Sequence, residues 1–321
     1  MSTTPRAGRP LVAALTTALL AVGLAACGPT APSEPAAEAA AARKVVDATG
    51  AEVSVPVAPK KVVVLTQEDL DAALALGVKP AGITNGQGLT TPPAYLGDRI
   101  AGIPVVGDLL RPVMDKVLQA EPDVILAGDM TDKQVLEQLR RIAPATLVTM
   151  TKDDDWKKHL ANVAKALNVE NKVAGVLADY DKKIAEVRGG LGAAGSALVS
   201  IVRWNPQGPS FMEKDQFASS VVADLGLRRP DAQRTEGTAH SQTLSLEALD
   251  KIDGDWLFLS TLTADGEQAL ATVRGTPAFQ QLKAVKANHV VTVPGSVWTT
   301  RGAPLAAMAV ADDVRKALTG S

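Results

Sequence analysis

The sequence predicts an α/β protein of two lobes joined by one long helix. Nearly 300 residues remain after an N-terminal leader, and the chain is 46% apolar, which is more than one hydrophobic core usually holds. Short β-branched runs alternate with helical stretches in both halves, a pattern typical of α/β lobes. Between these halves, residues 153–191 carry helical periodicity only.

Residues 1–26 predict a secretion signal that ends at a lipid-modified cysteine. Arg6 and Arg9 stand there without an acid, and the apolar run at 11–23 that follows is too short to span a membrane. The run closes with LAAC, which resembles the bacterial lipobox, where the cysteine thiol receives a diacylglycerol thioether. Cys27 is the only cysteine, so no disulfide can form within the chain. We expect an exported protein, anchored through Cys27 at the outer face of the cell membrane.

Residues 27–44 predict a flexible tether. They are rich in Ala, Pro, Ser and Glu and cannot bury enough surface to offset the entropy of ordering. Beyond them, no apolar stretch approaches the roughly 20 residues of a membrane helix, so we expect a soluble body. Without Arg6 and Arg9, the 33 Lys and Arg become 31 against 35 Asp and Glu, a formal charge of −4. Nothing in that balance attracts a nucleic acid.

The first lobe is expected over residues 45–169. After a turn at 47–50, the run KVVVL at 61–65 has the composition of a strand buried on both faces of a parallel sheet. A helix at 70–76 ends at Gly77, a suitable C-cap. The same signals predict further strands at 80–84, 103–106, 124–127 and 146–149, and helices at 114–120 and 131–142.

The middle of the chain is predicted to be helical. Its two amphipathic faces are Trp156, Leu160, Val163, Ala164 and Leu167, and then Val173, Val176, Leu177, Tyr180, Ile184 and Val187. The second helix, at 170–191, is about 20 residues or about 30 Å long and serves as the connection. The second lobe is expected over 192–321, from a strand at 196–202 to a closing helix at 303–318.

One pattern occurs in both halves. Asp115 stands eight residues before Asp123 in MDKVLQAEPDVILAG, and Glu247 stands eight before Asp255 in LEALDKIDGDWLFLS. In each, an acid opens a short helix, a second acid begins a strand, and four apolar residues follow. Acids favour first helical turns in general, so two unrelated α/β units explain the pattern. The alternative is a pair of related surface carboxylates, one on each lobe.

With these residues in view, the chain resembles the substrate-binding lipoproteins of ABC importers, in the iron-siderophore and cobalamin group. The matching segments lie between residues 45 and 318 and include DATGAEVSVPVAPKKVVVL, PVMDKVLQAEPDVILAG, LVSIVRWNPQGPSFM and NHVVTVPGSVWTTRGAPLAAMAVADDV. The resemblance implies two Rossmann-like lobes joined by a single long helix, with the ligand in the cleft between them. It also implies that Asp115 and Glu247 dock on basic residues of the permease, although Asp stands at 115 where the family usually has Glu.

Candidate ligand contacts lie in the loops after the strands, because open α/β lobes bind ligands beyond the carboxyl ends of their strands. Aromatic rings can pack on the oily backbone of a chelate, while guanidinium groups bind carboxylate, catecholate or hydroxamate oxygens. Arg203 and Trp204 are the leading candidates, with an ion pair and core packing as their alternative roles. The other candidates are Trp298, Tyr95, Arg111, Arg301 and Met212. Trp156 and Trp256 are interpreted as structural.

Direct metal binding and catalysis find little support in the sequence. His159, His240 and His289 lie far apart, with no Cys or second His at ligand spacing, so iron should arrive already chelated. No G-x-S-x-G elbow or phosphate-binding loop is present. The G-x-G-x-x-G match at 190–195 follows a helix rather than a strand, and we interpret it as a helix stop.

The leading hypothesis is a monomeric, non-enzymatic binding lipoprotein without an intrinsic cofactor. It captures an Fe(III)-siderophore chelate and delivers it to an ABC permease. Haem or a cobalamin is the alternative cargo within the same fold. An extracytoplasmic hydrolase and a ligand-sensing scaffold lipoprotein are the alternatives from other classes.

Overall fold

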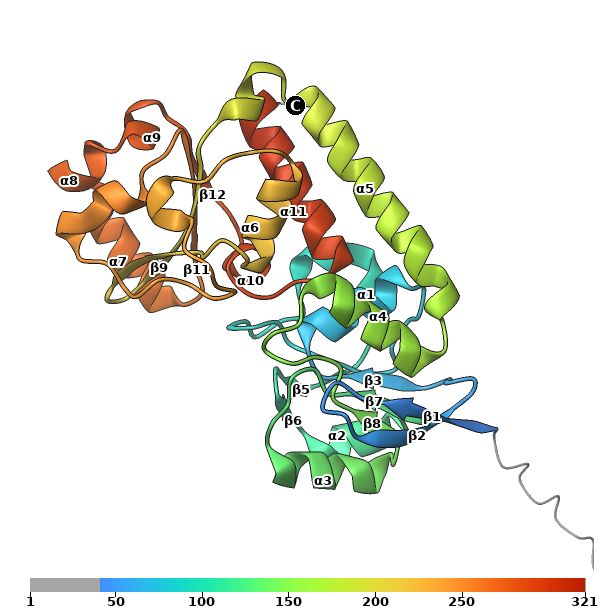
Figure 1. Cartoon of the computed structure of the whole chain (residues 1–321). Coiled ribbons are helices and arrows are strands. Elements are labelled where there is room, and N and C mark those ends of the chain that lie inside the picture. The colour runs from blue at the N-terminus through green and yellow to red at the C-terminus, as the bar shows by residue number, and fades with distance from the viewer. Residues whose placement is uncertain (1–40, 321) are drawn as a thin grey trace, which may run out of the picture. The chain divides into compact units, whose positions relative to one another are not determined.

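The computed structural model describes residues 41–320, while residues 1–40 and 321 lie outside that part. The signal at 1–26, Cys27 and most of the tether therefore stay predictions. Residues 41–320 belong to one compact unit of mixed helices and strands (Figure 1), and the predicted α/β class is confirmed. Within the described part, no helix is both long enough and apolar enough to cross a membrane.

A β-hairpin that the sequence patterns did not predict opens the described chain. Strand β1 (Ala42–Val46) pairs antiparallel with β2 (Glu52–Pro56). The carboxylate of Asp47 accepts hydrogen bonds from two backbone N–H groups of the predicted turn, and Val45 is buried. Residues 42–44 were assigned to the tether, so that boundary was wrong. Only Val45 of β1 is buried, so pairing with β2 rather than core packing holds most of this strand in place.

The first lobe is built on one largely parallel sheet. Its strands are β3 (Val62–Val64), β4 (Ile83–Thr84), β5 (Val105–Asp108), β6 (Arg111–Pro112), β7 (Val124–Leu126) and β8 (Thr146–Leu147). Two three-stranded ladders, β3-β7-β8 and β4-β5-β6, are joined by a parallel bridge between Val63 and Gly82, and only β6 runs antiparallel. All three residues of β3 are buried, as the continuous β-branched run predicted.

The predicted helices of the first lobe are confirmed. They are α1 (Gln67–Ala75), α2 (Met114–Gln119), α3 (Lys133–Ile142) and α4 (Trp156–Leu167), with the short 3-10 helix η1 (Ala94–Ile100) between β4 and β5. Three of them begin at a side chain that accepts from the first turn: Thr66 for α1, Asp132 for α3 and Asp155 for α4. These caps set where each helix starts, directly after a strand or loop at the carboxyl edge of the sheet.

Helix α5 (Val173–Gly190) carries the chain from the first sheet to the second (Figure 1). It follows a 3-10 turn, η2 (Glu170–Lys172), and its 18 residues span about 27 Å. The G-x-G-x-x-G segment lies at its end and in the next turn, η3 (Gly192–Ser196), which confirms a helix stop. The C-terminal helix α11 (Pro304–Thr319) packs against α5, α1 and α6 (Phe217–Asp224), so elements from both halves share one core cluster.

The second lobe has a four-stranded sheet in the order β10-β9-β11-β12. The strands are β9 (Val199–Asn205), β10 (Gly208–Phe211), β11 (Trp256–Thr261) and β12 (Val290–Thr292), and only β10 is antiparallel. Around them lie α6 (Phe217–Asp224), η4 (Asp231–Gln233), η5 (Leu246–Ile252), α7 (Ala264–Arg274), α8 (Pro277–Gln280), α9 (Lys283–Lys286) and α10 (Gly295–Trp298).

The sequence pattern shared by the two halves corresponds to a shared structural feature. Asp123, directly before β7, accepts from the backbone N–H groups of Lys60 and Lys61 at 2.7 and 3.0 Å, where β3 starts. Asp255, directly before β11, accepts from the N–H of Leu198 at 2.7 Å, where β9 starts. In each lobe this carboxylate aligns two neighbouring parallel strands. The helices that carry Asp115 and Glu247, α2 and η5, therefore occupy equivalent places before those strands.

Buried polar contacts join α1 of the first lobe to the C-terminal segment. The carboxylate of Asp71 accepts from the backbone N–H groups of Leu305 and Ala306, both at 2.8 Å, and so caps the first turn of α11. Tyr95 donates its hydroxyl to the same carboxylate at 2.7 Å. Because N–H groups of a first helical turn have no partner within the helix, this carboxylate ties the two parts together.

Candidate ligand-binding cleft

Two adjoining cavities lie where loops of the two lobes meet. Their volumes are about 580 Å³ and about 500 Å³. They share six lining residues, which are Met150, Lys152, Asp153, Phe217, Thr238 and Arg301. Because of this shared lining, the two cavities form one cleft. Both lobes contribute to it, since three of the shared residues precede α5 and three follow it.

The cleft lies at the carboxyl ends of the first lobe's strands. Glu68 follows β3, Gln87 follows β4, Leu109 follows β5 and Asp129 follows β7. Asp153 comes shortly after β8 and lines both cavities. Each lining segment of this lobe thus comes after a parallel strand, as expected for an open α/β sheet.

Arg301 crosses the cleft from the second lobe to the first. Its guanidinium donates to the carbonyl oxygens of Thr151 and Lys152 at 3.2 and 3.3 Å, and it lies 3.4 Å from a carboxylate oxygen of Asp129. Arg301 was predicted to line the site, and it borders both cavities. Three partners on the other lobe hold its orientation, so only part of its donor capacity can reach a ligand.

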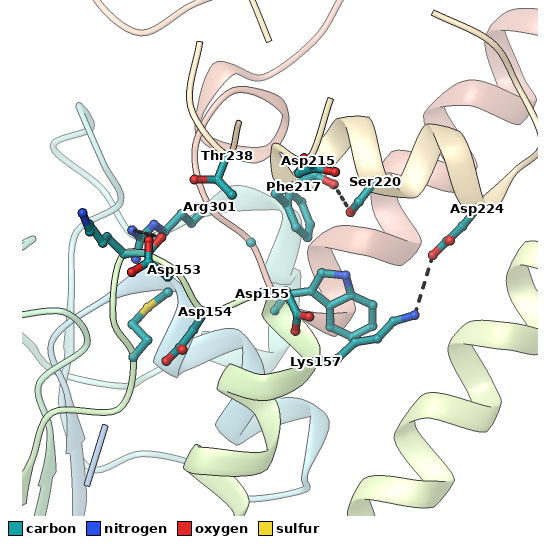
Figure 2. Close-up of a pocket in the computed structure, with 14 residues that line it drawn as sticks. Asp153, Asp154, Asp155, Lys157, Asp215, Phe217, Ser220, Asp224, Thr238 and Arg301 are labelled. Carbon is teal, nitrogen blue, oxygen red and sulfur yellow. Dashed lines mark hydrogen bonds and ion pairs between the residues drawn. The ribbon is translucent and has the colours of Figure 1, made fainter. Parts of the chain in front are cut away.

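Figure 2 shows a row of carboxylates along one wall of the smaller cavity, at Asp153, Asp154 and Asp155. Asp155 caps α4 by accepting from the N–H of Lys158 at 2.7 Å. Asp154 accepts from the N–H of Thr151 at 2.9 Å and pairs with the ammonium of Lys158. These two have structural partners, whereas Asp153 is exposed to the cavity.

Glu68, at the start of α1, is a buried carboxyl that lines the larger cavity. It is 7% exposed, and burial raises its pKa from 4.5 to about 7, against smaller opposing effects of its own backbone N–H and of His159. In the described part of the chain, no side chain of another residue forms a hydrogen bond or ion pair with it.

Beneath the cleft, Asp69 organises the loops after β7 and β8. It is completely buried, and it accepts from the N–H of Gly128 at 2.8 Å and from the hydroxyl of Thr149 at 2.6 Å. The Nε2 of His159 lies 2.9 Å from the same carboxylate. His159 is therefore a structural side chain that helps to hold the loops in place.

Two aromatic rings border the smaller cavity, and neither was predicted to do so. Trp156 was interpreted as structural, and it does pack edge-on against Tyr180 with ring centroids 4.9 Å apart, but it also lines the cavity. Phe217, at the start of α6, lines both cavities. The Trp256 ring stacks on His289 at 3.9 Å, away from the cleft, which agrees with its structural interpretation.

Replacing Gly302 by Ala tests whether the Phe217 ring shapes the cleft. A Cβ at this position would overlap the ring, so the ring must move or the loop must shift. We expect the free energy of unfolding to fall by about 1–3 kcal/mol and ligand affinity to fall with it. Denaturant unfolding and ligand titration measure the two effects. Gly275→Ala is the control, because a Cβ there meets no atom within 4 Å; equal behaviour of both variants would contradict the assignment.

Of the residues predicted from sequence, Arg301 and Met212 line the cleft and five others do not. Trp204 is 1% exposed and packs against Phe279 in the core of the second lobe. Trp298 is completely buried, stacks on Phe258 at 4.5 Å, and donates its indole N–H to Asp313 at 2.9 Å. Both rings are therefore core side chains that line neither cavity, because strand-end position does not reveal which face of the sheet a ring covers.

The remaining candidates also lie outside both cavities. Arg203 is half-buried, and its Nη1 donates to the carbonyl of Thr299 at 3.2 Å, so it supports the loop that carries Arg301. Tyr95 donates its hydroxyl to the buried carboxylate of Asp71. Arg111 is exposed on β6. Met212, in contrast, borders the larger cavity, although it is 1% exposed and belongs to the core. Its carbonyl accepts a hydrogen bond from the buried Arg229 at 3.1 Å.

No compact metal centre is present in the described residues, where no group of three or more His, Cys, Asp or Glu side chains could hold an ion. Several of the lining carboxylates have structural partners, among them Asp129, Asp154 and Asp155. The geometry suits a bulky ligand that fills a cavity.

Comparison with known proteins gives consistent matches over most of the chain. Residues 62–297 match the family described as periplasmic binding protein. The chain is 31% identical over 281 residues to the "Probable siderophore-binding lipoprotein YfiY" of Bacillus subtilis, covering 85% of this chain and 86% of that one. It is 26% identical over 264 residues to the achromobactin-binding periplasmic protein of Dickeya dadantii, covering 80% and 86%. The crystal structure of Staphylococcus aureus SirA complexed with staphyloferrin B superposes with a TM-score of 0.73 at 24% identity, covering 86% of this chain and 98% of that one.

Proposed function

The chain belongs to the periplasmic binding protein family, and on that premise we propose that it is the substrate-binding lipoprotein of an ABC importer that captures a ferric siderophore. The observation that carries the proposal is the cleft at the strand ends, bordered by Phe217, Trp156 and Arg301. Its size and mixed lining suit a bulky chelate with an apolar body and oxygen-rich groups. The relatives named above as siderophore- and achromobactin-binding support the same cargo class.

We propose a binding role rather than a catalytic one. The family is described as periplasmic binding protein, and the two relatives named above are named for binding a siderophore and achromobactin. Asp154 and Asp155 have structural partners, so neither is free as a nucleophile or base. The proposed location outside the membrane, with a lipid on Cys27 and a tether before β1, rests on the N-terminal sequence and on the lipoprotein name of YfiY.

Ligand titration of the lipid-free protein tests this function. We expect saturable quenching of tryptophan fluorescence by one class among ferric hydroxamates, ferric catecholates and ferric citrate, because Trp156 borders the cavity. Trp156→Phe should reduce the quenching more than Trp256→Phe, whose ring stacks on His289. Saturable quenching by haem or cobalamin alone would mean that the ligand is a tetrapyrrole and not a ferric siderophore. No response to any iron chelate or tetrapyrrole would overturn it.

Asp115 and Glu247 are proposed as the permease-docking carboxylates. Both are exposed, and within residues 41–320 neither forms an ion pair or side-chain hydrogen bond. Large exposed apolar side chains stand beside each of them, with Val113 and Leu118 on the first lobe and Leu246 on the second. An unpaired carboxylate with apolar neighbours suits a protein partner that offers a basic side chain.

The double substitution Asp115→Ala and Glu247→Ala should lower uptake of the iron chelate by cells about tenfold, through loss of two charged contacts of about 1 kcal/mol or less each. Ligand affinity should not change, because neither residue lines the cleft. Radioactive-iron uptake and fluorescence titration measure the two properties. Glu137→Ala, another exposed acid on α3, is the control. Normal uptake by the double variant would refute the docking role.

A further inference from the structure

The cleft is lined mainly by acidic side chains, whereas an anionic ligand would be bound best by basic ones. Acidic side chains outnumber basic ones around the two cavities. The acids are Glu68, Asp129, Asp153, Asp154, Asp155, Asp215 and Asp224, and the basic residues are Lys152, Lys157 and Arg301, with His240 in addition. Three of these acids face a basic side chain: Asp154 pairs with Lys158, Asp129 with Arg301 and Asp224 with Lys157. Asp153, Asp155 and Asp215 have no ion-pair partner among the described residues, and their charges lie in a partly enclosed space, where screening by water is weaker than on an open surface.

Two of the three basic groups already have partners. Arg301 faces Asp129 and two backbone carbonyls. The ammonium of Lys157 lies 5.4 Å from the ring centroids of both Trp156 and Tyr180, and 3.8 Å from a carboxylate oxygen of Asp224. Figure 2 marks this ion pair between Lys157 and Asp224 with a dashed line. Lys152 alone has no such partner among the described residues, and Asp153 stands next to it. Little positive charge is left to receive an anionic ligand.

Glu68 is the acid whose surroundings point most directly to a ligand. It is more than nine-tenths buried and borders the larger cavity. The charged groups around it are Asp69, Asp129 and His159, of which both acids oppose its ionisation. His159 is already engaged by Asp69 at 2.9 Å. Its own backbone N–H is the only donor that it has among the described residues, so its remaining acceptor capacity is open to a hydrogen-bond donor in the cavity.

Resting on the proposed function, we infer that the cleft selects a ferric chelate without net negative charge and that Glu68 receives a protonated amine or another hydrogen-bond donor of that chelate. Three hydroxamates each contribute one negative charge and neutralise Fe³⁺, so a tris-hydroxamate with a pendant ammonium is cationic. Three catecholates contribute two charges each and leave the complex at minus three. The acidic lining opposes the second type and favours the first.

Three ferric probes test this selection on the lipid-free mature protein by fluorescence titration. Ferrioxamine B is a tris-hydroxamate with a protonated terminal amine, its N-acetylated derivative lacks that charge, and ferric enterobactin is a tris-catecholate. We expect ferrioxamine B to bind about tenfold more tightly than the acetylated form, the worth of one charge-assisted hydrogen bond. The tris-catecholate should bind more weakly than either.

Glu68→Gln should remove the difference between the two hydroxamates by weakening ferrioxamine B alone. Asp153→Asn, at an exposed position, should weaken ferrioxamine B less, and Glu137→Gln on α3 should have no effect. Tight binding of the tris-catecholate would overturn the inference and leave the proposed function intact. An equal loss for both hydroxamates in Glu68→Gln would also overturn it. Failure of all three probes, ferric citrate and tetrapyrroles would instead count against the proposed function.

Discussion

Replacing Asp71 by Ala is expected to lower the free energy of unfolding by about 3–5 kcal/mol, more than a hundredfold in the unfolding equilibrium. The side chain is completely buried and accepts three hydrogen bonds, from the N–H groups of Leu305 and Ala306 and the hydroxyl of Tyr95. Its removal leaves those donors buried without an acceptor and the first turn of α11 without its cap. Each such donor costs about 1–3 kcal/mol.

Urea unfolding at neutral pH measures the effect of Asp71→Ala. Asp98→Ala is the matched control, because Asp98 is an exposed aspartate of the same lobe and should change stability by less than about 0.5 kcal/mol. Asp71→Asn should lose less than Asp71→Ala, since an amide oxygen can still accept from part of the set. A loss below about 1 kcal/mol in Asp71→Ala would show that this contact does not hold the two parts together.

The second large effect concerns pH. Burial raises the pKa of Glu68 from 4.5 to about 7, so the folded protein keeps a proton that the unfolded chain releases. The stabilising contribution of this group is therefore fully present below about pH 4.5 and is lost as pH rises through 7. At about 1.4 kcal/mol per pH unit, the loss amounts to about 3 kcal/mol by pH 8.

Glu68→Gln should therefore become progressively more stable relative to the wild type as pH rises from 4.5 to 8, because Gln does not titrate. Burial also raises the pKa of Asp71, to about 6, against the opposing hydrogen bonds from Tyr95, Leu305 and Ala306. Asp71 titrates in both the wild type and Glu68→Gln, so its contribution largely cancels when their free energies of unfolding are subtracted. Denaturant unfolding at pH 4.5, 6 and 8 provides the data. A stability difference that stays constant across these pH values would refute the assignment.

Much of the fold was readable from local patterns. The β-branched run at 61–65 predicts a doubly buried strand, and it becomes β3. The spacing from Val173 onward predicts the 18-residue α5. The repeated spacing of Asp123 and Asp255 predicts a feature common to both lobes, and in each the carboxylate joins two strands. Such signals are carried by neighbours in the chain, so the sequence displays them directly.

The residues that line the cleft were harder to predict from the sequence. Arg301 and Met212 were predicted, yet Trp204 and Trp298 turned out to be core residues, and Glu68 and Phe217 were missed. An arginine after a strand has a high cost of burial and tends to stay near solvent, whereas a tryptophan is equally satisfied in a core. Glu68 lies next to Asp69 and near Asp71, and the sequence does not show which of these three acids caps a helix, which holds a loop and which faces the cavity.

The sequence by itself determined the α/β class and the order of the elements, because these depend on composition and on short-range periodicity. It also predicts the export signal at residues 1–26 and the lipid on Cys27. Only the tertiary structure decided which side chains meet across the cleft, since Arg301 and Asp129 come from different lobes and are separated by more than 170 positions. It also decided that Asp71 caps a helix that begins over 230 residues later. Which side chains are buried, and which form hydrogen bonds or ion pairs, depends on packing between distant segments. That packing therefore also sets the charge of the cleft.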